Sequence, residues 1–164
     1  MKNTKTKKKG FTLIELMVVV AIMGLLAALA VISLNNARAR ARDARRISDV
    51  KQVQTALELY YLDNQEYPDT PTDGDFDGDL EGLCISDNGT KGIDTSCSGD
   101  VYMRVTPSNP QPRGDGDCGN TPYKYTAVTE DNSNTSYYIT YGLGSETGDV
   151  PAGTQTATPA GPDD

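Results

Sequence analysis

The chain has 164 residues, a formal net charge of −8 and no histidine. The lack of histidine removes the most frequent general base and metal ligand, and the sequence contains neither a convincing nucleophile–base pair nor a phosphate-binding loop. We therefore predict that the protein is not an enzyme. The acidic balance also argues against direct nucleic-acid binding, because carboxylates and phosphates repel each other.

The charges are strongly segregated along the chain. The first ten residues carry five lysines and no acid, and residues 38–51 hold six basic side chains against two acids. From position 52 onward, 20 acidic residues stand against four basic ones, a net charge of −16. We expect the arginines of residues 38–46 to form an exposed basic collar that faces acidic neighbours or a membrane surface.

Residues 11–34 are almost continuously apolar, with Glu15 as the one charged interruption. As a helix this segment would be about 36 Å long, which is enough to cross a bilayer. The lysines before it would stay on the cytoplasmic side. A carboxylate in such a segment costs a few kcal/mol and calls for a partner. Two alternatives are a signal peptide cleaved after Ala30 and a plain membrane anchor that leaves Glu15 unpaired.

The helical pattern continues without proline to about residue 63. Its second half carries an apolar stripe at spacings of three and four, which predicts an amphipathic helix; the stripe consists of Ile47, Val50, Val53, Leu57 and Tyr60. The helix should end near Asp63 and Asn64, because Pro68 follows closely.

The remainder predicts a small, loop-rich head with an antiparallel sheet. Residues 123–128 and 136–141 are rich in Tyr, Thr and β-branched residues and should form a hairpin, and residues 101–105 a further short strand. The hairpin should pack on the apolar stripe. We predict an α+β fold divided into a basic leader (1–10), a transmembrane helix (11–34), its basic and amphipathic continuation (35–63), a head (64–147) and a disordered tail (148–164).

The stretch Gly10-Phe11-Thr12-Leu13-Ile14-Glu15 resembles the N-terminal processing motif of type IV pilins and of the pseudopilins of type II secretion. The resemblance implies cleavage by a prepilin peptidase between Gly10 and Phe11, followed by N-methylation of Phe11. The segment 56–68, ALELYYLDNQEYP, is similar to the end of the long helix in major pseudopilins. The helix-kinking proline of many pilins is absent from the apolar run.

The resemblance implies a structural subunit of a type IV pilus-like or secretion pseudopilus filament. Its partners would be other copies of itself, other pilins, the peptidase, membrane lipid and the inner-membrane assembly machinery. The precursor would lie in the cytoplasmic membrane with its leader in the cytoplasm and its head outside, and the filament would be periplasmic or extracellular. Glu15 would meet the N-terminal amine of a neighbour; alternatively it bonds amides of its own helix start. The alternative function is a membrane-anchored acidic binding module that does not polymerise.

Two further sites are predicted in the head. Acids alternate around Gly78 as in the start of an EF-hand loop, which predicts a Ca²⁺ site or, alternatively, a solvated acidic loop; these acids are Asp73, Asp75, Asp77, Asp79 and Glu81. Position twelve of that pattern is Cys84 instead of glutamate. The three cysteines permit one disulfide, and the Cys84–Cys97 pairing is favoured because Cys118 would have to reach past the strand expected at 101–105.

Overall fold

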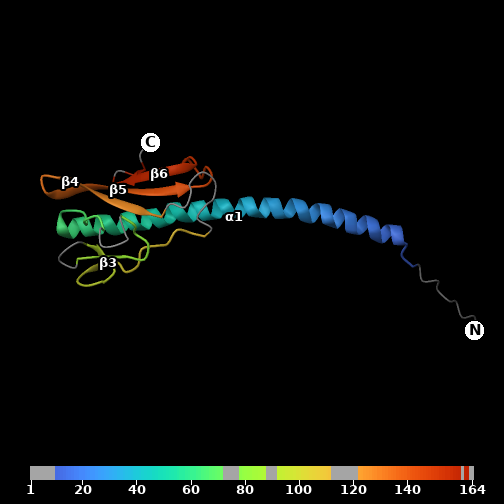
Figure 1. The fold of residues 1–164 in the computed structure, drawn as a ribbon, viewed down its shortest axis with the longest axis horizontal. Helices are drawn as coiled ribbons and strands as arrows, with labels where there is room; N and C mark the ends of the chain where they lie inside the picture. The colour runs from blue at the N-terminus through green and yellow to red at the C-terminus, as the bar shows by residue number, and fades with distance from the viewer. Residues whose placement is uncertain (1–9, 72–77, 88–91, 112–121, 160, 163–164) are drawn as a thin grey trace, which may run out of the picture. The chain divides into compact units, whose positions relative to one another are not determined.

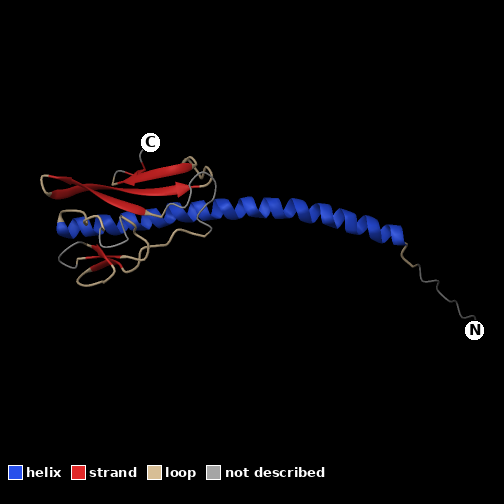
Figure 2. Cartoon of the chain, viewed as in Figure 1, coloured by secondary structure: helices blue, strands red, loops and turns tan. Residues whose placement is uncertain are grey.

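The computed structural model describes residues 10–71, 78–87, 92–111, 122–159 and 161–162. It contains one helix, α1 (Leu13–Asn64), and seven strands: β1 (Cys84–Ser86), β2 (Ile93–Asp94), β3 (Val101–Met103), β4 (Lys124–Glu130), β5 (Ser133–Leu143), β6 (Gly153–Thr158) and β7 (Gly161–Pro162). The chain divides into two compact units, Met1–Arg38 and Ala39–Asp164, and the second is the head unit. Figure 2 shows the helix and the strands of the described residues, which confirms the predicted α+β class.

Helix α1 is 52 residues long and matches the predicted continuous helix closely. It ends where Gln65 adopts a left-handed backbone conformation with φ of 63°. The Gln65 N–H still donates to the Tyr61 carbonyl at 2.8 Å, and the Asn64 side-chain amide donates to the Tyr60 carbonyl at 3.1 Å. These bonds satisfy carbonyls of the last turn, which would otherwise have no partner.

The first unit consists of the apolar start of α1. Every large apolar side chain between Phe11 and Leu34 is at least half exposed in the single chain. This part of the helix is long and apolar enough to cross a membrane. An apolar surface of this size needs lipid or other helices around it.

In the head unit, two antiparallel sheets pack against the second half of α1 (Figure 1). The larger sheet has the order β4-β5-β6-β7 and the smaller one the order β2-β1-β3. The predicted hairpin is present as β4 and β5, joined by Asp131 and Asn132 with φ of 51° and 65°. Two consecutive positive φ values are typical of a type I′ turn, whose twist matches that of paired strands. Strands β1 and β2 are too short to show a pattern, and sequence analysis missed them.

The core joins the predicted apolar stripe of α1 to tyrosines of the larger sheet. The Tyr67 ring lies 4.8 Å from that of Tyr137 and 4.6 Å from that of Tyr61, measured between centroids. Two of the buried hydroxyls have partners, since Tyr125 donates to the Pro68 carbonyl at 2.7 Å and Tyr137 to Glu58 at 3.3 Å. These bonds let tyrosine serve as a core residue without leaving its hydroxyl unsatisfied.

The prediction that residues 148–164 form a disordered tail is wrong for the two strands of this segment, Gly153–Thr158 and Gly161–Pro162. Strand β6 pairs antiparallel with β5, with Ala157 opposite Ile139, and β7 pairs with β6. Ala157 is buried, and the Gln54 side-chain amide of α1 donates to the Thr158 carbonyl at 2.8 Å. The segment is rich in Gly, Thr, Pro and Ala, so it contains few large apolar side chains that would predict a strand. It forms a strand because the free edge of β5 supplies backbone hydrogen-bond partners, which composition does not reveal.

This correction predicts that the C-terminal strand contributes to the stability of the head. We expect Ala157→Asp to lower the free energy of unfolding by about 3 kcal/mol, because it buries a carboxylate without a partner. Thr154→Asp, on the exposed side of the same strand, is the matched control and should stay within about 0.5 kcal/mol. Urea unfolding of the detergent-solubilised chain measures both. Equal effects of the two variants would mean that β6 adds nothing to the core.

The tyrosine core also predicts steep loss of stability in alkali. Burial raises the pKa of Tyr125 and of Tyr137 above the ordinary value of 10.0. The folded state therefore holds these phenol protons more tightly than the unfolded state, and the resulting stability is full below pH 10 and lost as the pH rises further. Tyrosinate absorbance should appear together with the loss of near-ultraviolet circular dichroism, whereas in urea all tyrosines should titrate near 10. Ionisation of all nine tyrosines before any unfolding would contradict this expectation.

Candidate functional site

The two residues of the predicted cleavage site are solvent-exposed and lie at the start of the described chain. Gly10 is exposed, and a Cβ atom placed on it would meet no other atom within 4 Å. Phe11 is 90% exposed. Neither residue is buried by the residues that the structure describes. A glycine that the local structure does not require is typical of a site that another protein recognises.

Glu15 is held by the first turn of its own helix. Its Oε2 accepts hydrogen bonds from the Thr12 backbone N–H and the Thr12 hydroxyl, both at 2.8 Å, and the Glu15 N–H lies 3.3 Å from the Thr12 hydroxyl oxygen. This reciprocal arrangement is a capping box, which satisfies amides at the helix start. The single chain therefore shows the alternative of an intrasubunit cap. Among the described residues, Oε1 has no hydrogen-bond partner.

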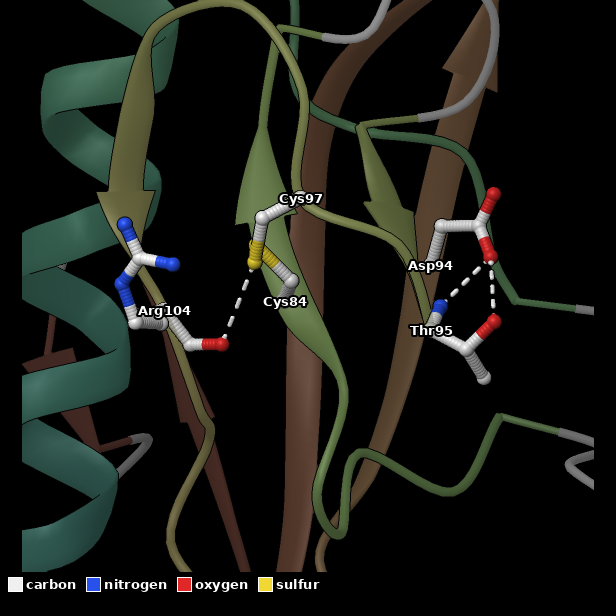
Figure 3. The surroundings of a disulfide bond; sticks show 5 residues. All are labelled: Cys84, Asp94, Thr95, Cys97 and Arg104. Carbon is white, nitrogen blue, oxygen red and sulfur yellow. Dashed lines mark hydrogen bonds between the residues drawn. A yellow bond between two sulfur atoms is a disulfide. The ribbon is translucent and has the colours of Figure 1, made fainter.

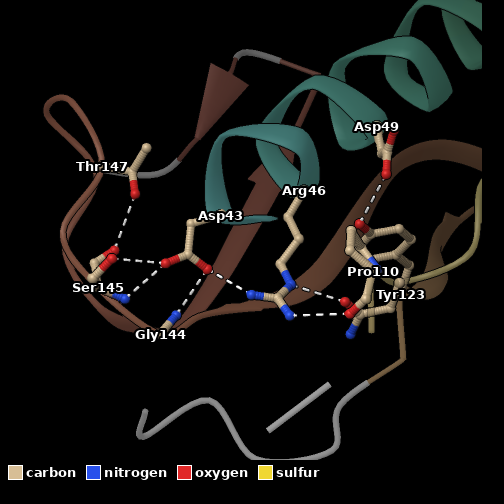
Figure 4. A network of polar contacts seen from close by, with 9 residues as sticks. Asp43, Arg46, Asp49, Pro110, Tyr123, Gly144, Ser145 and Thr147 are labelled. Atoms are coloured by element: carbon tan, nitrogen blue, oxygen red, sulfur yellow. Dashed lines mark hydrogen bonds and ion pairs between the residues drawn. The ribbon is translucent and has the colours of Figure 1, made fainter. Parts of the chain in front are cut away.

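The main polar site of the head is a buried ion pair on α1, shown in Figure 4. Asp43 and Arg46 are fully buried, and the Arg46 Nη1 atom lies 2.6 Å from the Asp43 Oδ1 atom. Asp43 also accepts from the backbone N–H groups of Gly144 and Ser145, at 3.0 and 2.9 Å. Its carboxylate thus binds the loop after β5.

Arg46 binds a second segment of the head. Its Nε donates to the Asn109 side-chain oxygen at 2.8 Å and its Nη2 to the Pro110 carbonyl at 3.3 Å. Paired and hydrogen-bonded charges of this kind can be buried at an acceptable cost. The pair therefore joins three parts of the chain: one turn of α1, the loop after β5 and the segment around residue 110. We call it the Asp43–Arg46 bracket.

The predicted exposed collar is therefore wrong for Arg46. Positions 43 and 46 extend the stripe of 50, 53, 57 and 60 at the same spacings of three and four, so the helical period already contained the signal. Asp49 is also buried and accepts from the Tyr123 hydroxyl at 3.2 Å. Burial raises the pKa of Asp49 above its usual range, against the opposing effects of this bond and of the Arg45 charge. Arg45 stays exposed.

Cys84 and Cys97 form a disulfide in the structure, the pairing that the sequence analysis favours (Figure 3). Cys84 begins β1 and is buried, whereas Cys97 lies in the connection to β3 with its Sγ 3.3 Å from the Arg104 carbonyl oxygen. The bond ties the smaller sheet to the chain that follows β2. Cys118 lies outside the described residues.

The predicted calcium loop lies largely outside the described residues, which exclude Asp73, Asp75 and Asp77. Of its other members, Asp79 accepts from the Glu81 N–H at 3.0 Å and forms a β-bridge with Lys124. Among the described residues, no three His, Cys, Asp or Glu side chains lie together as a metal site would require. The calcium site stays a prediction.

Comparison with known proteins bears on the N-terminal part of the chain. Residues 5–31 match the family model of the prokaryotic N-terminal methylation motif. The chain carries a prepilin-type N-terminus. Together with the relatives described next, this match confirms the resemblance to type IV pilins and type II secretion pseudopilins that Gly10, Phe11 and Glu15 predict.

The relatives that match this chain include type II secretion proteins and a type IV fimbrial protein. It is 42% identical over 66 residues to type II secretion system core protein G of Aeromonas hydrophila, covering 40% of this chain and 46% of that one. It is 44% identical over 64 residues to core protein G of Escherichia coli, covering 39% and 44% of the two chains. It is 49% identical over 65 residues to the type IV major fimbrial protein FimA of Dichelobacter nodosus, covering 40% and 42%.

The matched part of the prepilin-type chain thus spans less than half the length of these curated relatives. No solved structure matches it. The similarity accordingly concerns about two fifths of the sequence.

The bracket predicts very different effects for two neighbouring side chains of α1. Asp43→Ala removes the carboxylate from a buried guanidinium and from two buried N–H groups, so we expect a loss of about 3–5 kcal/mol in the free energy of unfolding. Arg45→Ala is the matched control, because that side chain is 69% exposed and its carboxylate contact is 3.8 Å long; it should cost about 0–1 kcal/mol. Urea midpoints of the purified variants measure both. Similar midpoints for Asp43→Ala and Arg45→Ala would contradict the role of the bracket.

Proposed function

We propose that this chain is a structural subunit of a type IV pilus-like or type II secretion-like filament, assembled through the start of α1. The observation that carries the proposal is the combination of a methylation motif over residues 5–31 with a helix whose apolar side chains are at least half exposed. An exposed apolar helix is costly in water, but lipid covers it before assembly and the helices of other subunits cover it afterwards.

Maturation begins, under this proposal, with cleavage between Gly10 and Phe11 at the cytoplasmic face of the membrane, followed by N-methylation of Phe11. The five lysines before Gly10 hold the leader on the cytoplasmic side. The exposure of Gly10 supports access by a peptidase. Removal of the leader takes away five positive charges and leaves the processed chain with a net charge of −13.

Glu15 is the assembly residue in this proposal. The capping bonds all use Oε2, so Oε1 can accept from the N-terminal amine of another subunit while the helix start stays capped. That amine is positive near neutral pH. Two opposite charges that are each costly in lipid are tolerable as a pair, which favours one axial offset between subunits. The partners follow from this: other copies, other pilins, a prepilin peptidase and the membrane assembly machinery.

The proposal is tested first by the native N-terminus. Mass spectrometry of protein from its host membrane should find a chain that begins at N-methylated Phe11. A chain that begins at Met1 would favour an anchored binding module instead, and one that begins at Val31 would favour a secreted protein. Gly10→Leu should block cleavage and leave the precursor in the membrane, because the side chain at the cut must be small.

Assembly gives the second test. Glu15→Val should be cleaved normally but should give at least about tenfold fewer filaments, because the N-terminal amine loses its carboxylate partner. Ser33→Val, another polar-to-apolar change in the same segment, is the matched control and should assemble normally. Filament counts by electron microscopy, together with sheared-fraction immunoblots, measure both. Wild-type filament numbers from Glu15→Val alone would show that other contacts set the assembly.

A further inference from the structure

The burial of two carboxylates gives one side of α1 in the head unit a single sign of charge. Asp43 and Asp49 point into the head and are buried. The exposed side chains of α1 between positions 40 and 62 therefore include three cations, Arg40, Arg45 and Lys51, and no exposed acid. We call this side the cationic face. The sequence of this stretch is basic overall, and the burial of Asp43 and Asp49 removes two of its three acids from the surface. The third, Glu58, is partly exposed and accepts from the Tyr67 and Tyr137 hydroxyls.

The cationic face also has a shape that can receive another surface. Ala44, Ser48 and Thr55 are small and exposed along the helix. Between their larger neighbours they leave a shallow open hollow of about 410 Å³, lined by Ala44, Ile47, Ser48, Lys51, Gln52 and Thr55. A hollow beside a cation accommodates a projecting group that carries negative charge.

The other end of the head unit carries the opposite charge. Five exposed acids gather where α1 ends and where β4 turns into β5: Asp63, Glu66, Asp69, Glu130 and Asp131. The two segments are tied together, because Ser133 donates to Glu66 at 3.3 Å and Asn134 donates to Asp69 at 2.7 Å. Figure 1 shows the β4–β5 turn beside the end of α1. Residues 59–71 and 125–143 contain no lysine or arginine. We call this the acidic end.

We propose that the acidic end of one copy docks on the cationic face of a second copy, an inference that rests on the proposed function as a filament subunit. Lys51 and Asp63 are separated by 12 residues of helix, about 18 Å, and Arg40 is about 17 Å farther away. A single copy therefore cannot bring its two ends together. A contact between two different surfaces of identical subunits either closes into a ring or repeats as an open helix, and a filament uses the second arrangement.

Two exposed acids among the described residues, Glu146 and Asp149, lie in the loop after β5. They follow Ser145, which binds Asp43 on the buried side of the helix. Val150 of this loop lines a small hollow together with Ile47 and Lys51, but neither acid lines the hollow beside Ala44 and Ser48. The projecting turn at Asp131 and Asn132 is the part of the acidic end that fits the hollow.

Site-specific photo-crosslinking in assembled filaments of the full chain tests the contact. A photoreactive residue at Ser48 or Thr55 should crosslink to peptides that contain residues 66–69 or 130–132 of another copy. The same residue at Thr154, on the exposed side of β6, is the control and should not yield these products. Crosslinks from Ser48 and Thr55 only to lipid, or to a different surface of the second copy, would overturn the proposal while leaving filament formation intact.

Charge exchange tests the chemistry of the contact. Arg45→Glu together with Lys51→Glu should lower the filament yield about tenfold. Adding Glu130→Lys and Asp131→Lys to the same chain should restore the yield, because the two surfaces again carry opposite charges. Arg104 is exposed and lies outside the cationic face. The variant Arg104→Glu is therefore the control for added negative charge and should assemble normally. Restoration of the filament yield would support the proposal. A quadruple variant that assembles worse than the double variant would overturn it. Failure of the wild-type chain to form any filament would instead refute the proposed function.

Discussion

A single helix has to satisfy two kinds of surroundings, and the rest of the structure follows from that constraint. The start of α1 is apolar on all sides and at least half exposed. Its second half is apolar on one stripe only, and both sheets of the head pack on that stripe. An apolar side chain is stable where water is excluded, whether by lipid, by another helix or by a sheet. The change of pattern along α1 therefore separates the part that needs other molecules from the part that builds its own core.

The Asp43–Arg46 bracket lies at the beginning of the head-unit part of α1. Each member of the pair satisfies the other and binds a distant segment: Asp43 the Gly144–Ser145 amides, and Arg46 the Asn109–Pro110 region. Such an arrangement stabilises little relative to apolar residues of the same volume, but it specifies which segments meet. It also removes one acid and one base from the surface. With Asp49 buried as well, the charge that α1 presents to other molecules differs from the charge of its sequence.

The N-terminal motif shows the contrast between residues used by the fold and residues available to partners. Thr12 and Glu15 cap the helix, so they have a role in the single chain. In the described part of the chain, a Cβ atom on Gly10 would meet nothing within 4 Å, and Phe11 is 90% exposed. When a residue has no role in the packing of its own chain, recognition by an external partner is the simplest physical reason for its presence. The match to a methylation motif over residues 5–31 agrees with this division.

The sequence by itself determined the helix, its end near Asn64, the hairpin of β4 and β5, and the processing motif. All of these depend on local patterns: helical period, turn residues and a fixed short spacing. The helical period placed Asp43 and Arg46 on the buried side of α1, but it did not decide the burial of Arg46, because two of the groups that Arg46 binds belong to a segment more than 60 residues away. Nor did the sequence reveal β6, whose small side chains carry no strong preference and which forms because β5 offers an open edge. Local propensity decides elements that form on their own, whereas pairing between distant segments decides those that do not.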